Sequence, residues 1–254
     1  MLYCAISPNR CSRLSPILAL ILLSLGSHAD GNEAHAETSL EKCAIKTAKP
    51  KKYYSSATVL KDFGKPVRQK LTKTFALADV DYPPGKMTWI CLKAERRLEL
   101  FARNRSGKYS KVLQYPIIGA SGKPGPKLKE GDMQVPEGFY RLSGFRPNLV
   151  AHMGLDVNYP NEEDREHARK EHRTNLGYDI LIHGSRWSTG CLAMGNEPIE
   201  EMFVLAHDVG LKNVSLIFAP CDLTETQPDV DMKTQPKWLP ALYARIKSAL
   251  EQFR

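Results

Sequence analysis

The sequence predicts a mostly β fold of the α+β class, with helices at its edges and one helix at its C-terminus. Two observations support this class. Short runs of β-branched and aromatic residues, each bounded by turn residues, dominate the chain from Met87 to about residue 184. Beyond Cys191 the apolar residues recur at helical spacing. The 254 residues, 42% hydrophobic and 25% charged, are typical of a globular protein with a core of its own.

Five strands are expected in this central part, and a sixth nearer the C-terminus. They are MTWICLKA (87–94), RLELFA (97–102), KVLQYPIIGA (111–120), GFYRLSGF (138–145), YDILIHG (178–184) and NVSLIFA (213–219). In the second run, aliphatic residues alternate with Arg97, Glu99 and Phe101, which is the period of a half-buried strand. This strand is therefore expected to expose one of its faces.

Three helices are expected outside these strands. One covers residues 67–78 and a second follows Cys191, with Asn196 as its N-cap and Gly210 as its end. The third, over residues 238–253, carries an apolar stripe that is expected to dock on its own domain. The charged stretch at 161–173 is expected to be a solvated loop or helix.

The N-terminus has the pattern of a secretory signal peptide. Arg10 and Arg13 precede the short apolar run at 16–25, and two small-x-small sites end at Ala29 and Ala36. The run is shorter than the ~20 residues that a membrane span needs. We expect residues 1–29 to be removed (or cleavage after 36), leaving a periplasmic protein without a transmembrane anchor. The predicted parts are then a basic N-terminal segment (30–84), a catalytic domain (85–222), and a C-terminal linker and helix (223–254).

The chain is basic, with a formal charge of +8. A basic protein can bind nucleic acid, but export argues against that partner. Attraction to an anionic polymer or lipid surface of the cell envelope is the better use of the charge, and solubility alone is the plainer explanation.

Four cysteines remain after removal of the signal peptide, namely Cys43, Cys91, Cys191 and Cys221. The surroundings of Cys191 indicate a free thiol, so the other three can form one disulfide at most. If a bridge exists, we expect Cys91–Cys221, because pairing of their strands would bring the two residues together. Cys43 would then be free.

The candidate site lies in ILIHGSRWSTGCLAMGN (180–196). A strand delivers His183 to its end, and Gly190 lets the chain turn before Cys191. An imidazole can take the thiol proton and create a nucleophile. The amides of Gly190 and Cys191 are candidate oxyanion donors, and the Gly184 carbonyl is the candidate acceptor that orients the imidazole. No second pair of ligands completes a metal site, so neither a metal nor a cofactor is expected.

This stretch resembles the signature of the YkuD-type L,D-transpeptidases, in which Ile-His-Gly precedes Ser/Thr-x-Gly-Cys. The resemblance extends over about residues 80–220 and implies a β-sandwich, with Cys191 as nucleophile and His183 as base. The segments FRPNLVAHMGLDVNYPNEEDR (145–165) and STGCLAM (188–194) are similar to a subgroup that includes an enzyme detaching outer-membrane lipoprotein from peptidoglycan.

Two positions depart from the cross-linking members of that family. Thr189 stands where they carry a second histidine, and Ala193 stands where they carry Arg or Asn. These departures favour the lipoprotein-releasing subgroup. The candidate substrate-binding residues are Ser188, Thr189, Lys129, Asp132 and Trp187. A Gly-Asp hairpin turn would explain Asp132 without a role in binding, and Trp187 either lines the pocket or only packs.

The resemblance implies acyl transfer on meso-diaminopimelate amide bonds in peptidoglycan stem peptides. Hydrolytic release of a peptidoglycan-bound lipoprotein is the preferred hypothesis. The alternatives are a transpeptidase that cross-links peptidoglycan or attaches lipoprotein, and a non-catalytic peptidoglycan-binding protein. A periplasmic thiol-disulfide enzyme is a weaker hypothesis, because the chain lacks a Cys-x-x-Cys pair.

Overall fold

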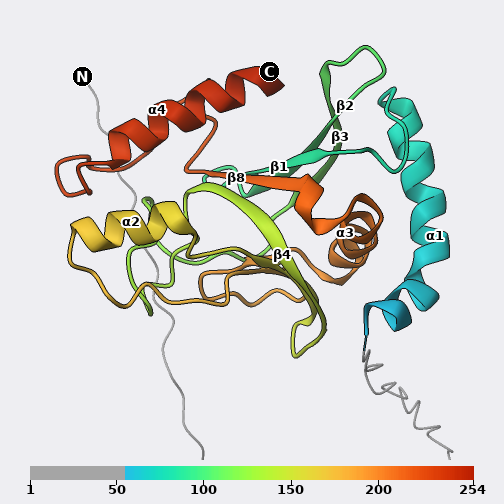
Figure 1. Ribbon diagram of the computed structural model, residues 1–254, viewed down its shortest axis with the longest axis horizontal. Helices are drawn as coiled ribbons and strands as arrows, with labels where there is room; N and C mark the ends of the chain where they lie inside the picture. Colours follow the sequence, from blue (N-terminus) through green and yellow to red (C-terminus); the bar gives the residue numbers. More distant parts are fainter. Residues whose placement is uncertain (1–54) are drawn as a thin grey trace, which may run out of the picture. The chain divides into compact units, whose positions relative to one another are not determined.

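The computed structural model describes residues 55–254, so the expected signal peptide and Cys43 lie outside the described residues. Five consecutive strands follow the first helix, and helices occur among the later strands (Figure 1). The helices are α1 (Ser56–Leu77), α2 (Glu162–Lys170), α3 (Asn196–Val209) and α4 (Leu239–Leu250), with 3-10 turns at Leu211–Asn213 and Glu251–Phe253. The strands are β1 (Met87–Leu92), β2 (Arg97–Arg103), β3 (Tyr109–Pro116), β4 (Gly138–Leu149), β5 (His152–Val157), β6 (Leu181–His183), β7 (Leu192–Ala193) and β8 (Val214–Ala219). None of the helices in this range is long and apolar enough to span a membrane.

The eight strands form a mixed sheet in the order β3-β2-β1-β8-β4-β5-β6-β7. The 12-residue strand β4 joins its two halves, because residues 138–141 pair with β8 and residues 142–149 pair with β5. β1 and β8 are parallel, as are β6 and β7, and the other neighbours are antiparallel. The α+β class is confirmed, while β5 and β7 are strands that the sequence pattern did not predict.

The main core takes side chains from both halves of the sheet. Trp89 of β1, Leu155 of β5 and Phe203 of α3 are fully buried in one apolar cluster. The helix α1 packs against α3, where Arg68 donates two hydrogen bonds of 2.7 Å to the Asp208 carboxylate. Burial of this cluster fixes the sheet on which the candidate site lies.

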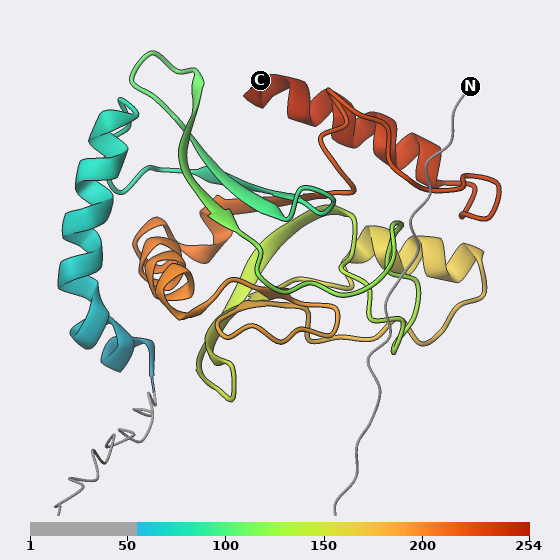
Figure 2. The same cartoon turned by 180° about the vertical axis from the view of Figure 1, so that it is seen from behind.

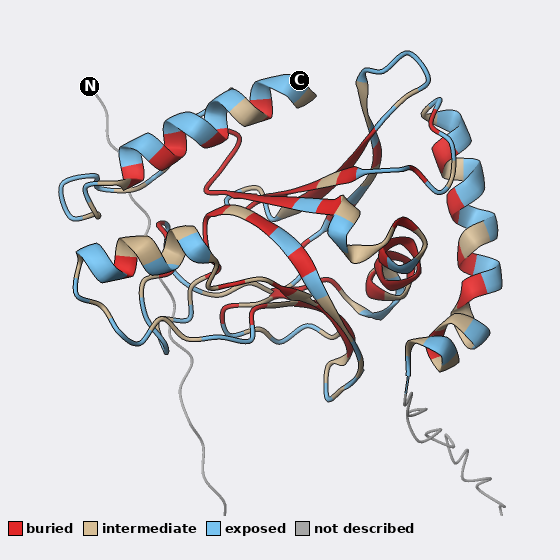
Figure 3. Cartoon of the chain, viewed as in Figure 1, coloured by how far each residue is buried: buried red, intermediate tan, exposed pale blue. Residues whose placement is uncertain are grey.

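A second apolar cluster lies under α4, on the other face of β1, β2 and β8. Phe101 and Glu99 of β2 are therefore both buried, and the expectation of a half-exposed strand was wrong. The α4 helix alternates buried and exposed residues, as Figure 3 shows. In Figures 1 and 2 α2 lies beside α4, and the Trp238 ring stacks on His167 of α2.

Two expected helices differ at their starts. The α1 helix begins at Ser56 rather than at residue 67, since the Ser55 hydroxyl caps it by accepting a hydrogen bond from the Thr58 amide. The N-cap of α3 is Gly195 and not Asn196. The Asn196 side chain instead accepts a hydrogen bond of 2.9 Å from the Ser185 amide, and so ties the helix to the loop after β6.

The expected Cys91–Cys221 disulfide is absent, and both thiols are free and buried. The strands do pair, with Cys91 opposite Phe218 in the parallel β1–β8 ladder. However, Cys91 belongs to the main core and Cys221 to the cluster under α4. Because the two side chains occupy opposite faces of the sheet, strand pairing does not bring their sulfurs together.

Candidate active site

His183 ends the short strand β6 and is 6% exposed. Its Nδ1 lies 2.6 Å from the Gly184 carbonyl oxygen, so in the neutral ring Nδ1 carries the proton and Nε2 is an acceptor. Burial lowers the pKa of His183, and the hydrogen bond to Gly184 opposes this shift only in part. The imidazole is therefore held neutral, the state that a general base requires.

Cys191 comes directly before β7, the parallel neighbour of β6. The register pairs Ile182 with Leu192, so Cys191 lies beside Leu181, and His183 is two residues further along the same face. The thiol donates a hydrogen bond to the Asp179 carbonyl (3.4 Å), and its sulfur accepts one from the Leu181 amide (3.3 Å). At rest the thiol thus bonds to the backbone of the β6 segment rather than to the imidazole.

Burial is the main cause that raises the pKa of Cys191. The Leu181 amide and the Lys127 ammonium act in the opposite direction, while Asp179 adds to the increase. Cys191 and His183 are thus both neutral near pH 7, and a thiolate at Cys191 would require transfer of its proton to a base.

The turn before the cysteine requires glycine, because Gly190 has a φ of +93° and an added Cβ would lie 3.2 Å from the Gln134 carbonyl oxygen. The Gly190 amide donates a 2.7 Å hydrogen bond to the Ser121 hydroxyl, which in turn donates to the Met133 carbonyl at 2.7 Å. This amide is therefore occupied by Ser121. Of the two expected oxyanion donors, only the Cys191 amide stands without a protein acceptor among residues 55–254.

The Gly-Asp loop is organised by a buried ion pair. Asp132 accepts a 2.6 Å hydrogen bond from Lys127, as well as bonds from three backbone amides of the same loop. Asp132 thus shapes the loop, which leaves little of its carboxylate for a ligand. The buried Lys127 is the basic residue of this loop that acts electrostatically on Cys191, whereas Lys129 is exposed.

The remaining candidates differ in their surroundings. The Ser188 hydroxyl donates a 2.5 Å hydrogen bond to the Cys191 carbonyl and so braces the turn. Trp187 is 87% exposed and does not pack in the core, and Thr189 is also exposed. The structure thus brings Ser188, Gly190 and Cys191 together with His183, while Trp187 and Thr189 extend toward solvent.

Metal ligation has no evident support in the described part of the chain. No group of three or more His, Cys, Asp or Glu residues within 55–254 is arranged to hold an ion.

The sequence model of the YkuD family, described as the L,D-transpeptidase catalytic domain, matches residues 86–212. This range includes every side chain of the site described above. The chain belongs to this family.

Two similar sequences extend the comparison. "Putative L,D-transpeptidase YafK" from Escherichia coli K12 is 34% identical over 167 residues, which is 64% of this chain and 61% of that protein. The protein of the same name from strain O157:H7 matches equally. The chain therefore spans less than two thirds of the length of these curated relatives.

The chain is also similar to solved structures, at TM-scores below 0.5. The helical cell shape determining protein Pgp2 from Campylobacter jejuni matches at 18% identity and a TM-score of 0.43, covering 79% of this chain and 78% of Pgp2. Bd1075 from Bdellovibrio bacteriovorus matches at 24% identity and a TM-score of 0.38, covering 52% of this chain and 47% of its own. No conclusion about function rests on these likenesses.

Proposed function

We propose that this family member is a cysteine acyl-transfer enzyme acting on meso-diaminopimelate amide bonds of peptidoglycan stem peptides. Cys191 is the nucleophile and His183 is the base. The observation that carries the proposal is the β6–β7 register, which sets the thiol and a neutral, oriented imidazole on one face of the sheet. A binding protein of the same fold would not need this pair.

The reaction follows from these positions. Nε2 of His183 takes the thiol proton as the sulfur attacks the amide carbonyl, and the Gly184 carbonyl stabilises the imidazolium through Nδ1–H. Collapse of the tetrahedral intermediate breaks the C–N bond, and the imidazolium returns its proton to the leaving amine. Water, activated by the same imidazole, then hydrolyses the thioester and restores Cys191.

We favour hydrolysis over transfer to a second peptide. Ala193 is fully buried in β7, and its amide and carbonyl bond to Gly119 and Ile118, so this position offers no polar side chain to an acceptor amine. Thr189 is exposed and carries no ring that could act as a second base. Both features support a hydrolase that releases peptidoglycan-bound lipoprotein. A transpeptidase remains the alternative outcome of the experiment below.

The site of action that fits this substrate is the periplasm. We propose that residues 1–29 direct export, since their charge, apolar run and small-residue site follow the order of a signal peptide. N-terminal sequencing of the mature protein tests this directly.

Replacing the nucleophile is the first test. Cys191→Ala should abolish turnover, since no other group can form the thioester, and it should leave the unfolding midpoint nearly unchanged. Cys221→Ala is the matched control, because that thiol lies in the cluster under α4 and should be dispensable for activity. Residual turnover of Cys191→Ala near the wild-type rate would contradict the assignment.

The second test identifies the reaction. Sacculi bearing covalently attached lipoprotein are digested with the pure full-length protein, and both products are analysed by mass. Free lipoprotein that carries no peptide fragment, together with an intact stem peptide ending in diaminopimelate, indicates hydrolysis. New cross-linked muropeptides indicate a transpeptidase. Labelling with a carbapenem reports on the nucleophile independently, because a non-catalytic binder would not be acylated at Cys191.

A further inference from the structure

A polar groove of about 650 Å³ lies next to the candidate site, since Asp179 is part of its lining. Its lining includes three arginines and three acids, contributed by β4, β5, the start of α2 and the segment before β6. They are Arg141, Arg146, Arg165, Asp156, Glu162 and Asp179.

The groove is linked to the reactive thiol through two neighbouring residues. Asp179 lines the groove, and its carbonyl accepts the hydrogen bond of the Cys191 thiol. In the sheet register Asp156 is opposite Leu181, which is the neighbour of Cys191, so the three residues form a row across β5, β6 and the start of β7. At about 4.8 Å per strand, Asp156 lies about 10 Å from Cys191 along this row.

The arginines of the groove differ in whether they form ion pairs. Arg146 is committed to both acids, donating to Asp156 (2.9 Å) and Asp179 (3.1 Å). The guanidinium groups of Arg141 and Arg165 form no ion pair with any residue in 55–254. Asp164 acts electrostatically on Arg165 but is not in direct contact with it, so both guanidinium groups can still receive a carboxylate ligand.

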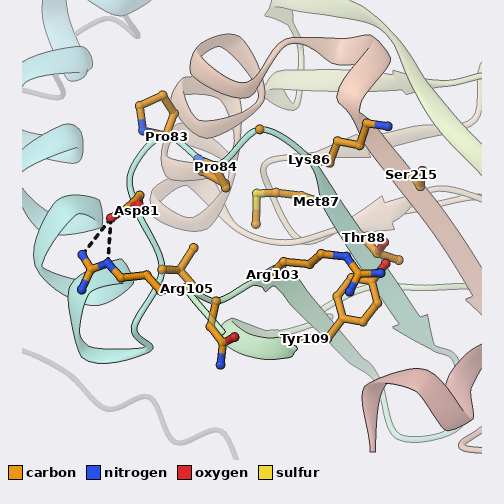
Figure 4. A pocket seen from close by; sticks show the side chains of 13 residues that line it. Asp81, Pro83, Pro84, Lys86, Met87, Thr88, Arg103, Arg105, Tyr109 and Ser215 are labelled. Carbon is orange, nitrogen blue, oxygen red and sulfur yellow. Dashed lines mark hydrogen bonds and ion pairs between the residues drawn. The ribbon is translucent and has the colours of Figure 1, made fainter. Parts of the chain in front are cut away.

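A second cavity, of about 560 Å³ at the start of β1, differs in this respect (Figure 4). There Arg105 is already bound to Asp81, as the dashed lines show, and Arg103 lies over the Tyr109 ring at 4.3 Å. Because its guanidinium groups are engaged, this cavity serves as a comparison for the groove.

We propose that the groove binds the zwitterionic end of the diaminopimelate side chain while its acyl carbon lies at Cys191. Arg141 and Arg165 bind the carboxylate. Asp179, with a side chain 58% exposed and one carboxylate oxygen left over from Arg146, binds the ammonium. The inference deepens the proposed function by naming the part of the peptide that is recognised, and it depends on that function for the substrate.

The test compares two soluble stem tetrapeptides, one with meso-diaminopimelate and one with lysine at the third position. Lysine keeps the side-chain ammonium but lacks the carboxylate. Their dissociation constants are measured by calorimetry on the full chain carrying Cys191→Ala, so that neither peptide is turned over. We expect the diaminopimelate peptide to bind about 10-fold or more tightly, since charge-assisted hydrogen bonds to Arg are lost with lysine.

The variant Arg141→Gln/Arg165→Gln should reduce this preference to about 2-fold or less, while binding of the lysine peptide changes little. The control, Lys86→Gln/Arg103→Gln in the cavity of Figure 4, removes the same charge elsewhere and should keep the full preference. If the chain carrying Cys191→Ala alone binds the two peptides equally, the groove assignment is wrong. This outcome does not depend on whether the arginine variant folds.

Acylation of the wild-type chain by a carbapenem separates the two proposals. If the chain is acylated but binds both peptides equally, the proposed enzymatic function is supported and the proposed role of the groove is contradicted. The opposite outcome is also possible: the wild-type chain is neither acylated nor active as a hydrolase, yet Arg141→Gln/Arg165→Gln removes the preference for the diaminopimelate peptide. That result supports the groove assignment and contradicts the catalytic role of Cys191. A preference that persists in that variant places the recognition elsewhere and contradicts the inference.

Discussion

At the scale of single residues, the proposed chemistry depends on the protonation of Cys191 and His183. Burial raises the pKa of Cys191 and lowers that of His183, so both are neutral at rest. A neutral pair avoids the cost of two separated charges in a poorly solvated site. In the proposed reaction, the ion pair would therefore form only when the substrate carbonyl receives the electron pair of the sulfur.

The pH dependence of acylation follows from the direction of the His183 shift. Because the pKa is lowered from its ordinary 6.5, the imidazole stays neutral below that pH, and activity is lost only as the pH falls through the shifted value. The acid limb of carbapenem acylation should have its midpoint below pH 6.5. The rate is measured by mass spectrometry from pH 4.5 to 8, with a correction for reagent decay, and a midpoint above 6.5 would contradict the described burial.

Ser121 is predicted to position the catalytic turn. Ser121→Ala removes the acceptor of the Gly190 amide and the tie to Met133, so the Cys191 sulfur loses its fixed place. We expect kcat to fall about 10- to 100-fold with a smaller change in KM, as for other small misplacements of a reacting group. Ser121→Thr keeps the hydroxyl and should recover much of the rate. Ser248→Ala, exposed on α4, is the control and should not alter kcat.

At the scale of elements, a buried network connects the C-terminal helix to the loop beside the site. Lys93, after β1, donates hydrogen bonds to two loop carbonyls and to Glu137, whose side chain is fully buried. The other carboxylate oxygen of Glu137 accepts a 2.6 Å bond from the hydroxyl of Tyr243 in α4. The loop that holds Ser121 is thus linked to the end of β1 through Lys93 and, through Glu137, to α4.

Two substitutions should separate the parts of this network. Tyr243→Phe removes one hydrogen bond to a charged acceptor and should cost about 1.5–3 kcal/mol of unfolding free energy. Glu137→Ala leaves the Lys93 ammonium without its counter-ion and should cost more, about 3–5 kcal/mol. Urea denaturation followed by circular dichroism gives both values. A larger loss for Tyr243→Phe than for Glu137→Ala would mean that the ion pair is not the centre of the network.

The sequence predicted those elements whose signal is local. Six strands were found from their composition, but β7 has only two residues and β5 contains Gly154, so neither carries a periodic pattern. The pattern of β2 could not show that α4, well over 100 residues later, covers its second face. In the site, Cys191 and His183 share one short motif, whereas Ser121 is distant in the sequence and reaches the Gly190 amide through a side-chain hydrogen bond that no local pattern shows.

At the scale of the whole molecule, α4 is the helix that covers the second face of the sheet. It covers the face of β1, β2 and β8 that would otherwise expose a continuous apolar surface. The predicted catalytic domain of residues 85–222 excludes this helix, and it also excludes Arg68 of α1, which binds Asp208. The architecture indicates that both flanking helices stabilise the fold around the site.

A chain shortened to end at residue 222 should therefore lose cooperative unfolding. It gives up the buried apolar residues of α4, each worth about 1.5–3 kcal/mol, for a total on the order of 10 kcal/mol. That loss is comparable with the whole stability of a typical domain. Thermal unfolding followed by circular dichroism measures it, and the full chain, which keeps α4 and the contacts of Arg254 with Glu99 and Asp222, is the reference. A sharp transition for the shorter chain would show that residues 85–222 fold without this helix.

The burial that keeps the Cys191 thiol protonated should also affect how the protein withstands oxidants. Peroxides and disulfides react with the thiolate and hardly at all with the protonated thiol. A cysteine that stays protonated until its substrate arrives is shielded from both. If Cys191 is the nucleophile as proposed, the burial that delays formation of the thiolate therefore also protects the sulfur between turnovers.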